Sequence, residues 1–240
     1  LQFVRFVPRV AAMGARVVLE CQPELAGLFA AVPGVAAVVA KGAPPPPYDL
    51  WAPMLSLPWL LGTGGDFLAE TVPYLRPVSR ADGLGRPPGT RATVGLVWAG
   101  KTTPRDRSWP LDALLPLFED PGLVWVSLQM GPRAADLQRL GVDHLVRDLG
   151  PLLTSFADTA AVMAALDAVV TIDTSAAHLA GALGRPTFVL LRYVSDWRWL
   201  DEPADSAWYP TMRLFRQPAP DDFAAPVAGL AAALAGFTPA

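Results

Sequence analysis

Residues 171–191, TIDTSAAHLAGALGRPTFVLL, constrain the fold most, because they are typical of a buried strand, a polar turn, a helix and a second buried strand. The first apolar run ends at Asp173, and we expect Thr174 or Ser175 to cap the helix through its hydroxyl. A glycine and a proline follow the helix in the order that usually ends one. This succession predicts neighbouring strands of a parallel sheet.

The start of the same helix predicts an anion site. We expect the amides of Ala176, Ala177 and His178 to lack intrahelical partners, and the helix dipole adds a partial positive charge there. Together these features suit a phosphate. The alternative is an ordinary strand and helix of a parallel sheet, in which His178 is a satisfied helix residue.

Composition excludes several classes of protein. The chain of 240 residues is 52% hydrophobic and 17% charged, which predicts a globular protein with a sizeable core. A net charge of -3 and the lack of a basic stripe argue against nucleic acid as a partner. The apolar runs end well before the ~20 residues that a membrane span needs. Cys21 is the only cysteine, which excludes an internal disulfide and favours the reducing cytoplasm.

The first part of the chain predicts half of a doubly wound sheet. Apolar spacing and turn residues indicate helix, strand, helix, strand and a short apolar element, at 1–13, 15–21, 23–32, 35–40 and 51–61. A strand normally precedes the first helix of such a sheet. We therefore expect a first strand and its turn upstream of Leu1, and an N-terminal half that is incomplete.

The Pro-, Gly- and Arg-rich residues 76–91 predict a linker to a second α/β run. Strands and helices alternate from there to residue 191, as in an open parallel sheet that binds ligands at the carboxyl ends of its strands. The expected fold class is α/β, with two Rossmann-like parallel-sheet halves that face a cleft. The expected units are 1–80, 91–220 and a terminal helix at 221–240 that packs back towards the N-terminal half.

Several motifs, in their order and spacing, carry a family resemblance. They are VGLVWAGKTTPRDRSWPL, VSLQMGP, the run from SFADTAAV to PTFVLL, DWRW and SAWYPTMRLFRQ, preceded by QFVRFVPRVAAMGARVVLECQPEL, LSLP and PYL. Together they resemble the GT-B glycosyltransferase domain that follows tetratricopeptide repeats in many bacterial proteins. That family is related to the ADP-heptose heptosyltransferases and, more distantly, to the O-linked N-acetylglucosamine transferases.

The resemblance implies transfer of a sugar from a nucleotide-sugar donor without a metal ion or other cofactor. The C-terminal half would bind the nucleotide and the N-terminal half the acceptor, a protein or a glycan, and tetratricopeptide repeats would precede the chain. The residues implied for the nucleotide diphosphate are Gly100, Lys101, Arg107, Thr174, Ser175 and His178. Those implied for the base, ribose or sugar are Gln129, Asp158, Thr159, Asp173 and Trp197.

Some of these assignments have alternatives. Arg107 stands where relatives place a phosphate-binding lysine, and a guanidinium can grip two phosphate oxygens at once. Lys101 and Arg105 also fit a solvated loop. The pair Asp158 and Thr159 fits a helix cap equally well. The aromatic residues Trp197, Trp199, Trp208 and Tyr209 fit either stacking on a ligand or packing.

Ser175 departs from the glycine that heptosyltransferases usually carry after Asp-Thr. A side chain there narrows the approach to phosphate, which argues against ADP-heptose as the donor.

The sequence lacks the residues or motifs that other kinds of active site need. Two histidines and one cysteine are too few for a zinc cluster, and the motifs of serine hydrolases, nicotinamide enzymes and Walker A ATPases are absent from the sequence. The resemblance implies a catalytic base upstream of Leu1. Two alternatives stay open: an inactive module that binds nucleotide-sugar or protein, and a sugar-nucleotide epimerase.

Overall fold

A computed structural model describes residues 1–63, 72–79, 81–201 and 204–239. Its first part is small, and its two strands β1 and β2 pair in parallel. The order of helices and strands is the one that the sequence predicts. The elements are η1 (Gln2–Phe6), α1 (Val7–Ala12), β1 (Val17–Cys21), η2 (Pro23–Leu25), α2 (Ala26–Phe29), β2 (Val35–Ala40), η3 (Met54–Ser56) and α3 (Leu57–Leu60).

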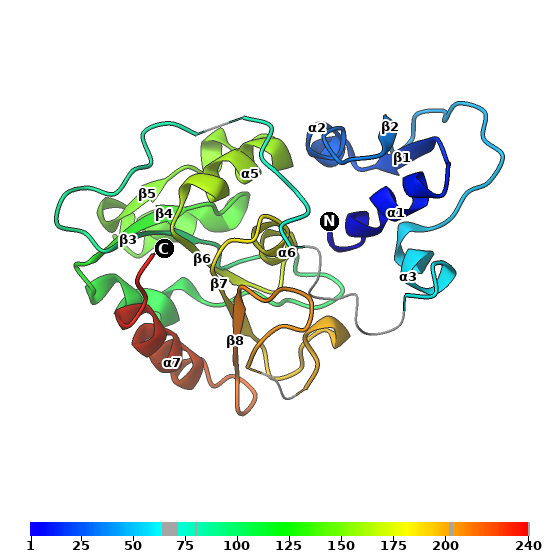
Figure 1. Cartoon of the computed structure of the whole chain (residues 1–240). Helices are drawn as coiled ribbons and strands as arrows, with labels where there is room; N and C mark the ends of the chain where they lie inside the picture. Colours follow the sequence, from blue (N-terminus) through cyan, green and yellow to red (C-terminus); the bar gives the residue numbers. More distant parts are fainter. Residues whose placement is uncertain (64–71, 80, 202–203, 240) are drawn as a thin grey trace.

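The second part contains a six-stranded parallel sheet (Figure 1). Its strands are β3 (Ala92–Leu96), β4 (Leu123–Ser127), β5 (Val146–Asp148), β6 (Ala168–Ile172), β7 (Thr187–Leu191) and β8 (Met212–Arg216). Its α-helices are α4 (Asp136–Arg139), α5 (Phe156–Ala165), α6 (Ser175–Ala182) and α7 (Ala224–Ala235). Short 3-10 helices complete it: η4 (Leu111–Glu119), η5 (Pro132–Ala135), η6 (Asp143–Leu145), η7 (Gly150–Leu152) and η8 (Trp197–Trp199).

The strand order of this sheet is β5-β4-β3-β6-β7-β8. The chain adds strands outward on one side of β3, then returns to the other side of β3 with β6 and adds β7 and β8 there, so the switch point lies between β3 and β6. Such a switch point opens a crevice outside the carboxyl ends of the two central strands, where doubly wound folds bind ligands. The residues that follow β3 and β6 are therefore the first place to look for a site.

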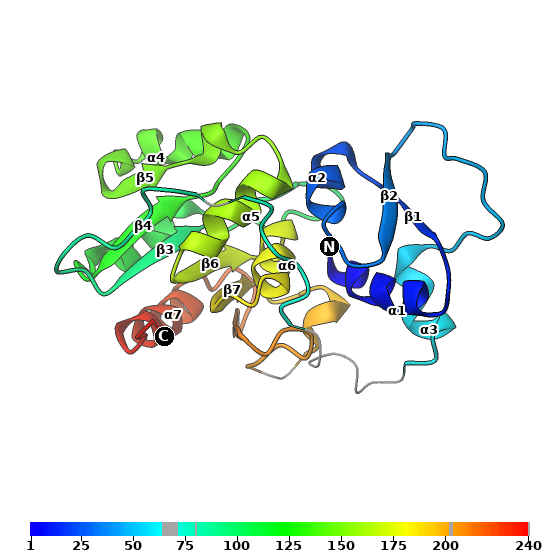
Figure 2. The ribbon, with the colours of Figure 1, turned by 45° about the horizontal axis from the view of Figure 1, so that its top comes forward.

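Helices cover both faces of the sheet, which explains the continuous apolar runs of its central strands. All five residues of β3, β6 and β7 are buried. One face packs on α5 and α6, through residues such as Met163 and Leu179, and the other packs on η4 and α7, through Leu114 and Leu230. Figure 2 shows α6 on the side nearest the N-terminal elements and α7 on the far side.

The N-terminal part shares its apolar core with α5 and α6. Leu28 and Phe29 of α2 belong to the same cluster of buried residues as Met163 and Leu179, and η1 contacts α6. The two parts are thus held together by buried apolar surface, which is the main favourable term in such contacts.

The position of the terminal helix differs from the sequence-based expectation, which was wrong. Instead of packing back towards the N-terminal half, α7 contacts η4, β7 and β8. The reason is its apolar stripe of Val227, Leu230 and Leu234, which completes the core on the outer face of the sheet. Only its carboxyl end meets the linker, where the Arg91 guanidinium donates to the carbonyl of Leu234.

Two further elements differ from expectation. The strand β8 extends the sheet by one strand that the sequence analysis did not predict. The helix expected near residue 111 is a 3-10 helix with Pro116 inside it, and this residue has no amide to donate within an α-helix. Among the described residues, no helix has the length and apolar character needed to cross a bilayer.

Candidate functional site

The loops after β3 and β6 meet at the switch point of the sheet. Gly100 lies so close to Thr174 that a Cβ atom added at Gly100 would stand 2.8 Å from the Thr174 methyl carbon. The Gly100 amide donates to the Ser108 hydroxyl at 3.1 Å, and the Ser108 amide donates to Asp106 at 2.8 Å. Hydrogen bonding from Ser108 also holds the pKa of Asp106 below its usual range. The loop is therefore internally braced.

An ion pair joins the same two loops. The Arg107 guanidinium donates to the Asp173 carboxylate at 3.0 Å. Asp173 is only 5% exposed, whereas 37% of the Arg107 side chain is exposed. A buried carboxylate thus holds one nitrogen of the guanidinium, while part of the Arg107 side chain stays exposed.

A hollow of about 340 Å³ adjoins this ion pair, and three of the residues that line it are Arg105, Arg107 and Arg192. Arg192 follows β7 directly, donates to the Ser108 carbonyl at 3.3 Å, and pairs with Asp221 at 2.8 Å. Sequence analysis overlooked Arg192. Its position immediately after a buried apolar strand is the signal that points to it, by the same reasoning that selected Asp173.

The amino end of α6 borders the switch point. Thr174 caps this helix, and its hydroxyl accepts from the Ala176 amide at 3.2 Å, while the Ala177 amide donates to the Thr174 carbonyl at 3.1 Å. These bonds correct the expectation that both amides lack partners. Ser175, the first helical residue, is exposed, so this end of the helix faces solvent.

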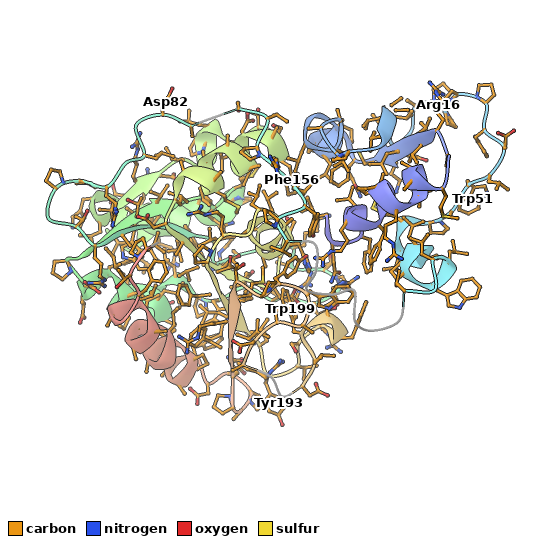
Figure 3. The ribbon with its side chains drawn as sticks, viewed as in Figure 1. Arg16, Trp51, Asp82, Phe156, Tyr193 and Trp199 are labelled. Atoms are coloured by element: carbon orange, nitrogen blue, oxygen red, sulfur yellow. The ribbon has the colours of Figure 1, made fainter. Side chains whose placement is uncertain are left out.

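His178 lies in a pocket of aromatic side chains. Its Nδ1 atom is 3.0 Å from the Tyr209 hydroxyl, and its ring stacks on Trp199 with a centroid distance of 5.3 Å and an interplanar angle of 12°. Trp199 is labelled in Figure 3. Burial lowers the pKa of His178 to about 3, an effect that Arg198 and Arg5 strengthen and Asp196 opposes. The imidazole is neutral at pH 7 and acts there as a hydrogen-bonding group without charge.

Three of the predicted binding residues have structural partners. Gln129 is 4% exposed, and its Oε1 accepts from the amides of Trp98 and Ala99 at 3.0 and 2.8 Å. Its Nε2 donates to the carbonyls of Ala99 and Met130 at 3.2 and 2.9 Å. These bonds tie the ends of β3 and β4 together and occupy both ends of the amide.

The other two residues, Asp158 and Thr159, belong to the start of α5. Ser155 and Asp158 form a reciprocal capping box, and the Thr159 hydroxyl donates to the Ser155 carbonyl at 3.0 Å. Hydrogen bonds from Thr154 and Ser155 keep the pKa of Asp158 low. The helix-cap alternative therefore describes the contacts that these two side chains make.

Lys101 and Trp197 extend outward. Lys101 is exposed, and Trp197 is 59% exposed with the Arg198 guanidinium 4.5 Å from its ring centroid. Asp196 caps η8 by accepting from the Arg198 amide. Although burial alone would raise it, the pKa of Asp196 is lowered overall by hydrogen bonds from Arg198. Among the described residues, no group of three His, Cys, Asp or Glu side chains has an arrangement that would hold a metal ion.

Comparisons with known proteins show what the chain is similar to. Residues 102–204 match the model of glycosyltransferase family 9 (heptosyltransferase). The segment that carries the ion pair and α6 is therefore similar to that family. The match does not extend to tetratricopeptide repeats, which stay a prediction.

Solved structures show the fold. The ADP-heptose LPS heptosyltransferase II of E. coli matches with a TM-score of 0.61 at 12% identity, over 98% of this chain and 95% of that one. The E. coli heptosyltransferase WaaC with ADP matches with a TM-score of 0.45 at 19% identity, over 98% of this chain and 70% of that one. The chain thus has the α/β fold with parallel sheets of GT-B heptosyltransferases over nearly its whole length.

A similar sequence is protein FlbA of Caulobacter vibrioides, which is 27% identical over 189 residues. The matched region covers 70% of this chain but only 30% of FlbA. The chain therefore spans less than a third of the length of that relative.

Proposed function

We propose that this chain binds a nucleotide-sugar at the switch point of its six-stranded sheet and serves in transfer of the sugar to an acceptor. The acceptor oxygen would attack the anomeric carbon as the bond from that carbon to the diphosphate breaks, and the electron pair would leave on the diphosphate. Negative charge grows on the leaving group, so donors aimed at it lower the barrier.

The Arg107–Asp173 ion pair is the observation that carries this proposal. A buried carboxylate fixes a half-exposed guanidinium at the place where doubly wound sheets bind ligands. Arg105 and Arg192 line the same hollow together with Asp106 and Asp221, and Asp221 pairs with Arg192. The exposed start of α6 adds the partial charge of a helix amino end. Together these groups suit a diphosphate without a metal ion.

The other parts of the proposal follow from the resemblance. The C-terminal part would hold the donor, the N-terminal part a protein or glycan acceptor, and a base upstream of Leu1 would take the acceptor's proton. The resemblance would also place Lys101, Ser175, Trp197 and Gly100 at the donor site, where the Ser175 side chain would disfavour ADP-heptose. Cys21 is a buried free thiol, which fits our proposal of a cytoplasmic protein.

Calorimetric titration with ADP, UDP, GDP and CMP and with their sugars tests the proposal. One of the nucleoside diphosphates should bind with a much higher affinity than the other nucleotides. The Arg107→Ala variant should lose about 10- to 100-fold in affinity, because hydrogen bonds to charged groups are the stronger kind, and Arg107→Lys should retain part of it.

Arg86→Ala is the matched control. Arg86 pairs with Asp167 just before β6, at the opposite end of the strand that Asp173 follows, so its loss should leave affinity unchanged. Equal affinities for wild type and Arg107→Ala would show that Arg107 does not contact the nucleotide. Tight binding without sugar transfer to any acceptor would favour the inactive binding module.

A further inference from the structure

Tyr209 connects His178 to a buried polar cluster. Tyr209 is fully buried, and its hydroxyl lies 3.0 Å from His178 Nδ1 and 3.4 Å from the Tyr74 hydroxyl. The Arg5 guanidinium lies over the rings of both phenols from the η1 side. Its guanidinium stands 4.3 Å from the Tyr74 ring centroid and 5.1 Å from that of Tyr209.

The direction of the proton in the Tyr209 contact follows from what its neighbours can do. A guanidinium has donors only, so Arg5 cannot accept the Tyr209 proton. Burial raises the pKa of Tyr209 well above its usual value, so its hydroxyl keeps its own proton. The nearer acceptor for that proton is His178 Nδ1, at 3.0 Å against 3.4 Å for the Tyr74 oxygen.

A neutral imidazole carries one ring proton, and the partner of one nitrogen decides the place of that proton. When Nδ1 accepts, the proton stands on Nε2. Trp199 and Tyr209 are both buried and cover one face and one edge of the ring, whereas His178 itself is half-buried. Because Nδ1 is bonded to Tyr209, Nε2 is the ring nitrogen that remains for a hydrogen bond to a ligand. Side chains of a helix also lean towards its amino end, where the proposed diphosphate lies.

We infer that Tyr209 is a positioning residue that holds His178 in the Nε2–H tautomer, so that the imidazole presents a hydrogen-bond donor to an oxygen of the diphosphate. The part of this inference that concerns the ligand rests on the proposed function. The tautomer itself does not, and it is read out on the free protein.

Long-range ¹H–¹⁵N NMR of the imidazoles tests the tautomer directly. The chain has two histidines, so a His144→Gln variant assigns the His178 signals. In the wild type, Nδ1 of His178 should show the shift of an unprotonated nitrogen and Nε2 that of a protonated one. Tyr209→Phe should move both shifts towards a mixture of tautomers. Tyr74→Phe removes a hydroxyl from the same cluster without touching His178, and its spectrum should match the wild type.

Two results would overturn the inference: a protonated Nδ1 in the wild-type protein, or unchanged imidazole shifts in Tyr209→Phe. Should Tyr209→Phe fail to fold, the wild-type spectrum alone decides. Tyr209→Phe should also lower the affinity for the nucleotide diphosphate by about 3- to 10-fold, which corresponds to the loss of one well-placed hydrogen bond. Tyr74→Phe should leave this affinity unchanged. If no nucleotide binds the wild type, the proposed function fails while the tautomer result stands.

Discussion

At the scale of single residues, the partners of a polar side chain decide whether it remains available to a ligand. Arg107 is held by one buried carboxylate and keeps donors free for the crevice, whereas Gln129 spends both ends of its amide on the backbone. Both follow strands whose carboxyl ends line the crevice. Position at the end of a strand therefore selects candidates, and the hydrogen-bond partners separate binding residues from structural ones.

Replacing Gln129 tests its structural role. In Gln129→Met the amides of Trp98 and Ala99 lose their buried acceptor, and a buried group without a partner costs ~1–3 kcal/mol. We expect urea denaturation to show a loss of about 2–5 kcal/mol in the free energy of unfolding. A loss below about 0.5 kcal/mol would show that these amides find other partners.

The buried imidazole of His178 makes stability depend on pH. The folded ring resists protonation down to a pKa of about 3, whereas the free side chain is protonated near 6.5. The unfolded state therefore binds more protons in this window, and the free energy of unfolding falls as the pH falls through it. Above pH 6.5 the ring is neutral in both states and contributes no slope.

Between about pH 6 and 5, the wild type should lose up to ~1.4 kcal/mol more than His178→Gln, which has no imidazole to protonate. Urea denaturation at both pH values measures this difference. Carboxylates such as Asp158 titrate in both proteins and cancel in the comparison. Parallel pH profiles for wild type and His178→Gln would contradict the pKa that we assign to the buried ring.

At the scale of secondary structure, a glycine on the inner face of a helix sets how close that helix lies to its neighbours. A Cβ atom added at Gly181 of α6 would come within 2.4 Å of Met212 and 2.5 Å of the Tyr209 ring. At Gly229 of α7 the nearest atom would be Phe215 Cδ1, at an ordinary contact distance of 3.5 Å. The two helices therefore have different tolerance for the same substitution.

Gly181→Ala and Gly229→Ala should change stability in opposite directions. Alanine is favoured over glycine in a helix by up to ~1 kcal/mol, so Gly229→Ala should raise the free energy of unfolding by about 0.5–1 kcal/mol. In Gly181→Ala the overlap with Tyr209 should outweigh this gain and cost ~1–3 kcal/mol. Thermal and urea denaturation measure the stability of the two variants. If both substitutions stabilised the protein, β8 would have to shift freely away from α6.

At the scale of the whole molecule, the N-terminal elements depend on a buried cation as well as on apolar contact. Arg5 is 4% exposed and donates twice to the Trp208 carbonyl, at 3.2 and 3.3 Å, across more than two hundred residues of sequence. The same guanidinium supports Tyr209 and Tyr74. One side chain thereby joins η1 to the loop that holds His178 in place.

Arg5→Leu should therefore weaken the junction of the two parts. Removing the donors of a buried charged group costs ~1.5–3 kcal/mol per hydrogen bond, so we expect a loss of about 3 kcal/mol in the free energy of unfolding and faster proteolysis within residues 1–60. Arg9→Ala, one helical turn further on and exposed, is the control and should behave like the wild type. Equal proteolysis of both variants would mean that the apolar core alone fixes the N-terminal part.

The comparison of expectation and structure shows where local signals are sufficient. The strands β3, β6 and β7 follow from contiguous residues, and the sequence predicts them. The strand β8 was not predicted, because it is the edge strand of the sheet and only two of its five residues, Met212 and Leu214, are buried. Short edge strands carry weak periodicity.

The sequence by itself determined the alternation of strands and helices, the polar turn at Asp173 and the family resemblance, because each depends on neighbouring residues or on motif spacing. Only the tertiary structure decided that Arg107 pairs with Asp173, that Gln129 is bound to the backbone, that α7 stays on its own sheet and that Tyr209 lies against His178. These outcomes depend on which side chains meet after distant segments pack. Hydrogen-bond capacity is finite, so the partner that arrives there decides whether a polar residue remains available to a ligand.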